Sequence, residues 1–210
     1  MIDARLAPAQ KWLLTWPAAA LMRRGISADH ISLAGFAMGA LAVPALGFGA
    51  YGLALALLTI NRVSDGMDGA VARASTPSDR GAFLDIALDF VFYALFPLGF
   101  ALADPASNAL PAAVLIAAFV GTGSSFLAFA SIAAKRGQTA ADYPAKGIHY
   151  LGGLTEGFET ISVFVAMCLY PAAFPWLAYA YAAACALTTL MRWHQGWTVF
   201  GIATKDHPAP

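Results

Sequence analysis

A stretch of 32 residues without Asp, Glu, Lys or Arg, 30–61, limits how this chain can fold. A helix needs about 20 residues to cross roughly 30 Å of hydrocarbon, and proline and glycine residues interrupt the stretch. Two such helices cannot fit between Asp29 and Arg62. A second span that begins near Tyr51 must therefore continue through charged positions to about Arg73.

The composition predicts a membrane protein. Of the 210 residues, 60% are hydrophobic and 11% are charged, whereas ordinary soluble chains carry about 25% charged residues. The length suits a single domain, 1–210, and a formal net charge of zero leaves no basic face for nucleic acid. Cys168 and Cys185 lie in apolar stretches and are interpreted as packing residues.

Hydropathy and helix breakers predict an all-α integral membrane bundle of six transmembrane helices. Residues 3–22 mix charges with Trp12 and Trp16, which is typical of an interfacial amphipathic segment, although a plain leader into the first span is the alternative. The first apolar run follows basic residues instead of opening the chain, so no cleavable signal peptide is expected. The expected spans are about 31–48, 51–73, 81–102, 109–133, 157–172 and 176–195.

Basic residues fall on one side of these six spans. The opposite loops, near residues 48, 105 and 173, contain no Lys or Arg. The positive-inside rule therefore predicts that both termini and the aspartate-bearing ends of the second and third spans face the cytoplasm. The basic residues on that side are Arg5, Lys11, Arg23, Arg24, Arg80, Lys135, Arg136, Lys146 and Lys205.

The charged part of the second and third spans has a regular pattern. It reads DGMDGAVAR at 65–73 and GAFLDIALD at 81–89, and it contains four aspartates, Asp65, Asp68, Asp85 and Asp89. At this spacing the aspartates share one face of each helix. Four carboxylates brought together repel one another unless a cation or shared protons lie among them. Mg²⁺ or Mn²⁺ suits such oxygen ligands, and a diphosphate is a natural substrate.

The pattern DxxDGxxAR followed by GxxxDxxxD resembles the signature of the CDP-alcohol phosphatidyltransferases, integral membrane enzymes of phospholipid synthesis. Residues 27–32, SADHIS, are similar to a family motif before the first span. The stretches GTGSSFLAF and YLGGLTEGFET are similar to a small bacterial inner-membrane subgroup likened to phosphatidylglycerophosphate synthases. The loop between Arg73 and Gly81 is one residue shorter than is usual in the family. The shorter loop is expected to affect contacts between the loop and the nucleotide more than the positions of the aspartates.

The resemblance implies transfer of a phosphatidyl group from CDP-diacylglycerol to an alcohol, with release of CMP, by a homodimer in the cell inner membrane. Asp65, Asp68 and Asp85 are the expected ligands of one or two Mg²⁺ or Mn²⁺ ions. Asp89 is the expected general base and a candidate ligand of a second ion. The residues expected to bind the CDP-lipid are Ser32, Gly69, Ala72, Arg73 and Gly81.

The acceptor is less constrained by the sequence. Glycerol 3-phosphate is the first expectation, followed by inositol phosphate, with serine or another alcohol behind them. An anionic acceptor needs cations near Asp89, but positive-inside anchoring explains Lys135 and Arg136 equally well. Ser124 and Ser125 could bind an acceptor phosphate or bond back to their own helix. The candidate acceptor-binding residues are Ser131, Lys135, Arg136 and Arg192.

Other functions were compatible with parts of the pattern. A prenyltransferase also binds a lipid diphosphate through aspartates, but its motifs lie far apart in a longer bundle. A cation transporter would carry the ion as cargo, and a silent relative would bind lipid without catalysis. Arg62 is interpreted here as neutralising the aspartate cluster.

Overall fold

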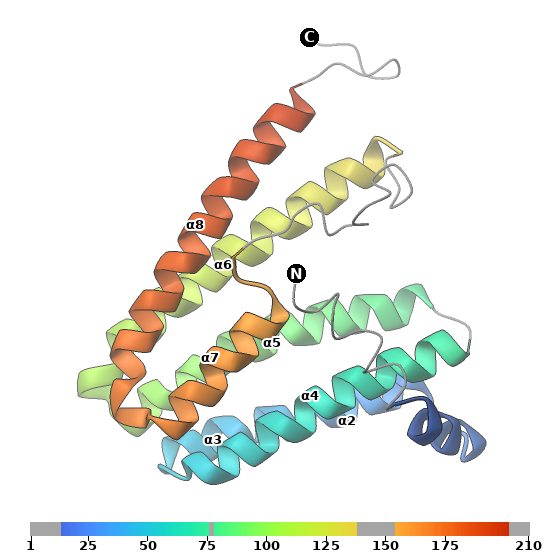
Figure 1. Ribbon diagram of the computed structural model, residues 1–210, viewed down its shortest axis with the longest axis horizontal. Coiled ribbons are helices and arrows are strands. Elements are labelled where there is room, and N and C mark those ends of the chain that lie inside the picture. The colour runs from blue at the N-terminus through green and yellow to red at the C-terminus, as the bar shows by residue number, and fades with distance from the viewer. Residues whose placement is uncertain (1–13, 76–77, 138–153, 202–210) are drawn as a thin grey trace.

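The computed structural model describes residues 14–75, 78–137 and 154–201, and all regular structure in these ranges is helical. The helices occupy the six predicted ranges, and the first range is divided between two helices (Figure 1). Residues 14–23 are also helical. The elements are α2 (Ala28–Ala40), α3 (Ala42–Gly47), α4 (Tyr51–Ala74), α5 (Asp79–Ala103), α6 (Pro105–Lys135), α7 (Gly157–Leu169), a 3₁₀ turn (Pro171–Ala173) and α8 (Phe174–Phe200).

Within the described residues, four helical stretches are long and apolar enough to cross a membrane. Helix α4 has a similar length, 24 residues, but it carries the charges of the aspartate motif. Helix α7 has 13 residues and spans about 20 Å at 1.5 Å per residue, less than the hydrocarbon thickness. The all-α prediction is confirmed, whereas the count of six spans remains a prediction. The four stretches are Ala28–Gly47, Asp79–Ala103, Pro105–Lys135 and Pro171–Phe200.

Helices α6 and α8 are longer than predicted and pack along each other (Figure 1). Helix α6 starts at once after α5, because Asp104 caps it by accepting a hydrogen bond from the Ser107 amide at 3.2 Å. At the other end Arg136 donates to the carbonyl oxygens of Val199 and Phe200, at 3.3 and 2.6 Å. These bonds satisfy carbonyls that a helix end otherwise leaves without partners, and they favour the extension of α8.

Two glycines bring α2 close to α4. A Cβ atom at Gly39 would lie 2.8 Å from Cγ of Asn61, and one at Gly35 would overlap the side chain of Ser64. Small residues at such positions let membrane helices approach closely, since packing and hydrogen bonding replace the hydrophobic effect there. The Asn61 side-chain amide uses this proximity and donates to the Gly35 carbonyl oxygen at 3.0 Å.

Aromatic rings hold α5 against α7 and α8. Phe96 stacks on Phe164 and Phe100 stacks on Phe174, each pair with centroids 4.4 Å apart. All four rings are fully buried. Since stacked aromatic pairs contribute about 0.5–1.5 kcal/mol beyond their buried area, this layer fixes the register of α5.

The described part of the predicted interfacial segment packs against α4. Ala18 is buried with Ala70 and Val71, while Trp16 is 76% exposed. This placement agrees with a segment that lies across the end of the bundle (Figure 1). Residues 3–13 of the segment lie outside the described residues.

Gly99→Ala should destabilise the bundle. The new Cβ would lie 2.8 Å from Leu46 Cβ and 3.1 Å from the Val43 carbonyl oxygen, and such overpacking typically costs about 1–3 kcal/mol. Thermal unfolding in detergent should show a lower Tm. Gly52→Ala is the matched control because nothing lies within 4 Å of its Cβ, and an equal Tm loss in both variants would contradict the prediction.

Candidate metal and nucleotide site

Three of the four aspartates meet at one point between α4 and α5. Ligand oxygens of Asp65, Asp68 and Asp85 all lie within 4.8 Å of one another. Asp68 is buried, Asp65 is half-buried and Asp85 is exposed, so the group opens on one side. Three carboxylates at this separation repel one another, and their hard oxygens fit the coordination that Mg²⁺ or Mn²⁺ prefers. The residues present therefore fit a divalent cation.

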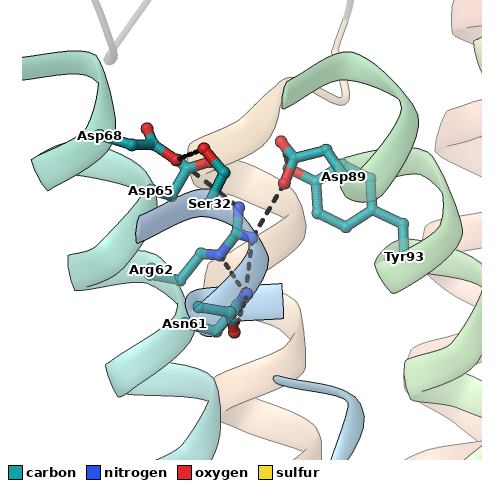
Figure 2. Close-up of polar contacts among 8 residues, drawn as sticks. Ser32, Asn61, Arg62, Asp65, Asp68, Asp89 and Tyr93 are labelled. Carbon is teal, nitrogen blue, oxygen red and sulfur yellow. Dashed lines mark hydrogen bonds and ion pairs between the residues drawn. The ribbon is translucent and has the colours of Figure 1, made fainter. Parts of the chain in front are cut away.

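Ser32 of α2 belongs to this group as a partner of an aspartate. Its hydroxyl donates to Oδ2 of Asp68 (Figure 2). Ser32 was predicted to bind the CDP-lipid, and the structure gives it a second, orienting contact. A hydrogen bond of this kind restricts how a ligating carboxylate rotates, as outer partners of metal ligands commonly do.

Asp89, the fourth aspartate, lines the same small cavity as the other three but is not part of their closely spaced group. Its Oδ1 accepts a hydrogen bond from Nη2 of Arg62 at 2.9 Å, and its Oδ2 lies 3.5 Å from the Tyr93 hydroxyl (Figure 2). Arg62 Nη1 also lies 3.8 Å from Oδ2 of Asp65. The guanidinium therefore lies between Asp89 and the three-aspartate group.

Asn61 and Tyr93 belong to the site although the sequence pattern did not predict them. Asn61 Oδ1 accepts hydrogen bonds from Nε and Nη2 of Arg62, at 2.8 and 2.6 Å. Tyr93 follows Asp89 by one helical turn, a spacing that could have suggested the contact. No sequence signal distinguished Asn61, because its role depends on how closely α2 approaches α4.

All five residues predicted to bind the CDP-lipid line one open cleft beside the aspartates. Its volume is about 770 Å³, within the usual range of ligand pockets. The three clustered aspartates also form part of its wall. The predicted residues in this lining are Ser32, Gly69, Ala72, Arg73 and Gly81.

The glycines of this cleft leave room for neighbouring polar groups. A Cβ at Gly69 would lie 3.1 Å from Nη1 of Arg73, and one at Gly81 would lie 3.3 Å from Oδ1 of Asp29. Asp29 forms an ion pair with Arg80 across the cleft lining. Residues 76–77 of the shortened loop lie outside the described residues.

The candidate acceptor residues have different surroundings. Ser131 and Lys135 are exposed on the last turns of α6, and Arg136 contacts the end of α8. Arg192 lines a separate cavity of about 180 Å³ with Tyr93 and Glu156, and it donates to the Thr122 carbonyl oxygen at 2.9 Å. The hydroxyls of Ser124 and Ser125 bond back to their own helix, to the carbonyl oxygens of Gly121 and Thr122.

Ser32→Ala should weaken Mn²⁺ binding by roughly 10-fold or more, because Asp68 loses its orienting hydrogen bond. Ser32→Thr retains a hydroxyl and should bind nearly as tightly as the wild type. Titration followed by the electron paramagnetic resonance signal of free Mn²⁺ measures both. Equal affinities in the alanine variant and the wild type would contradict the role of Ser32.

Comparison with known proteins agrees with this geometry. The chain is 50% identical over 197 residues to the inner membrane protein YnjF of Escherichia coli (strain K12), covering 94% of this chain and 96% of YnjF. A similar fold is found in a solved structure of Mycobacterium tuberculosis phosphatidylinositol phosphate synthase in complex with manganese and citrate. The TM-score is 0.64 at 21% identity, and the match covers 88% of this chain and 89% of the other. The family model of CDP-alcohol phosphatidyltransferase matches residues 26–199. The chain therefore belongs to the CDP-alcohol phosphatidyltransferases, a family of membrane enzymes.

Proposed function

We propose that this enzyme transfers a phosphatidyl group from CDP-diacylglycerol to a small alcohol and releases CMP. The observation that carries the proposal is the meeting of three carboxylates at the wall of a cleft of about 770 Å³ lined by small residues. Such a cleft suits a nucleoside diphosphate. The negative charge of the diphosphate needs a cation, and small residues let the ligand approach the helix backbone closely.

Asp65, Asp68 and Asp85 would hold the cation, Mg²⁺ or Mn²⁺. When bound, such an ion neutralises the charge of the diphosphate and stabilises the departing CMP. Manganese accompanies the Mycobacterium tuberculosis enzyme of similar fold. Arg73, which lines the same cleft, would add a positive charge beside the phosphates.

Asp89 is the proposed acceptor of the proton from the attacking alcohol. As the oxygen–phosphorus bond to the acceptor forms and the bond to CMP breaks, the hydroxyl proton passes to the Asp89 carboxylate. Because Asp89 is separate from the three clustered aspartates, one of its oxygens can face the acceptor while Arg62 holds the other. This division gives metal binding and proton transfer to different carboxylates.

The cavity lined by Arg192 is the proposed binding site for the acceptor. It is lined by Tyr93, so a molecule bound there would lie against the side chain whose hydroxyl is 3.5 Å from Oδ2 of the proposed base. The Arg192 guanidinium would pair with the phosphate of a phosphorylated alcohol, in competition with the Glu156 carboxylate that lines the same cavity. Glycerol 3-phosphate is the first candidate, then inositol phosphate.

The similarity to YnjF supports placing the enzyme as a multi-pass protein of the inner membrane. We propose six spans, with α4 and α7 completing the bundle, and with the aspartates, both termini and the active site facing the cytoplasm. The basic residues at these helix ends support that orientation. The homodimer expected from the family is part of the same proposal.

CMP release by purified protein tests the reaction. Supplied with CDP-diacylglycerol, Mg²⁺ and single acceptors, the wild type should form CMP with one of them. Asp89→Asn should lower kcat by about 100-fold or more, since a positioned base typically contributes that much. The control is Asp104→Asn. Asp104 follows the end of α5 that is far from the aspartates, and asparagine there still caps the start of α6. Ion flux without CMP would favour a transporter, and transfer from a prenyl diphosphate would favour a prenyltransferase.

Arg192→Gln should raise the KM for the phosphorylated acceptor by roughly 10-fold or more, because a charge-assisted hydrogen bond is lost. The KM for CDP-diacylglycerol should not change. Lys135→Gln serves as comparison, since Lys135 is exposed and explained by anchoring. An unchanged acceptor KM in Arg192→Gln would place the acceptor elsewhere.

A further inference from the structure

The Arg62 guanidinium lies between two of the aspartates. Its Nη2 is 2.9 Å from Oδ1 of Asp89, and its Nη1 is 3.8 Å from Oδ2 of Asp65. Figure 2 shows the guanidinium between the two carboxylates. Paired metal ions in enzymes of phosphate chemistry are about 3.5–4 Å apart, so a second ion held by Asp89 would compete with this guanidinium for space.

The guanidinium is fixed on several sides. Asn61 Oδ1 accepts two of its hydrogen bonds, and Asn61 is itself held by the Gly35 carbonyl oxygen. The rings of Phe92 and Tyr93 face the guanidinium carbon, with centroids at 5.1 and 5.8 Å. The Arg62 side chain is 17% exposed. An arrangement with this many partners leaves the side chain little freedom to move aside for an ion.

We propose that the Arg62 guanidinium replaces a second cation, so that the site binds a single divalent ion on Asp65, Asp68 and Asp85. Arg62 thereby acts as a positioning residue that keeps Asp89 free of metal and holds its carboxylate toward the acceptor. The role in orienting Asp89 rests on the proposed function, whereas the number of ions does not.

Charge and geometry favour this assignment over a second ion. A metal ligated by Asp89 would need its oxygen at about 2.1 Å, where the carboxylate now accepts from Arg62. Arginine stays charged under all physiological conditions, so its positive charge cannot be lost by deprotonation. If a metal ion displaced the Arg62 guanidinium, the guanidinium would lie against aromatic rings and lose its carboxylate and amide partners. Such a loss is costly in a poorly solvated site.

The test counts Mn²⁺ ions on the purified full-length protein in detergent, without substrate. The wild type should bind one ion per chain with an uncoupled six-line resonance spectrum, and Asp89→Asn should bind it with the same affinity. Two ions in the wild type, or an ion lost in Asp89→Asn, would overturn the proposal. The number of Mn²⁺ ions bound by the wild type tests the proposal even where a variant fails to fold.

Replacing Arg62 tests whether it stands in for a cation. Arg62→Gln should gain a second, spin-coupled Mn²⁺, and the double variant Arg62→Gln with Asp89→Asn should return to one. Arg62→Lys keeps the charge and should also bind one. A single ion in Arg62→Gln would overturn the replacement of a cation by Arg62.

Kinetics tests the positioning role separately. Arg62→Lys should lower kcat by roughly 10-fold or more with an unchanged KM for CDP-diacylglycerol, since lysine cannot make the paired contacts of arginine. A full kcat in Arg62→Lys would contradict the positioning role. Absence of CMP release in the wild type would refute the proposed reaction, while the ion count would still decide the role of Arg62.

Discussion

Repulsion among carboxylates within an apolar bundle is the constraint that the rest of this structure satisfies. Each charged side chain at the centre of a membrane helix costs on the order of 2.5–3.5 kcal/mol on insertion scales. The chain places four aspartates near one another on α4 and α5. Three features offset their repulsion: the half-buried cation Arg62, the hydroxyl of Ser32, and a cleft that opens the three-aspartate group to ligands.

Helix packing supplies the geometry that these contacts need. Gly35 and Gly39 let α2 approach α4, and this approach places Ser32 beside Asp68 and lets Asn61 reach the α2 backbone. On the other side, the aromatic layer of α5 fixes the helix that carries Asp85 and Asp89. A small displacement of either helix would therefore change the distances between the aspartates, even though none of these glycines and aromatic rings lines the cleft.

The sequence predicted those features that follow from local spacing. The charge-free stretches located the helices, and the helical register of the aspartates predicted that all four carboxylates meet. The structure brings three of them, Asp65, Asp68 and Asp85, within 4.8 Å of one another and pairs Asp89 with Arg62. Contacts between helices were not predictable in the same way. Asn61 resembles any polar residue in an apolar helix, and its role follows from a glycine that lies 26 residues earlier in the chain.

The same reasoning separates two of the three cationic residues considered for the acceptor. Arg136 satisfies carbonyl oxygens at the end of α8, a structural task that its position in the sequence does not reveal. Arg192 donates to a carbonyl of α6 but still borders a cavity that also contacts Tyr93. Tyr93 in turn lies 3.5 Å from Oδ2 of Asp89, so this one side chain connects the cavity to the proposed base. An acceptor bound at Arg192 would thus approach the proposed diphosphate site from the side of Tyr93 and Asp89.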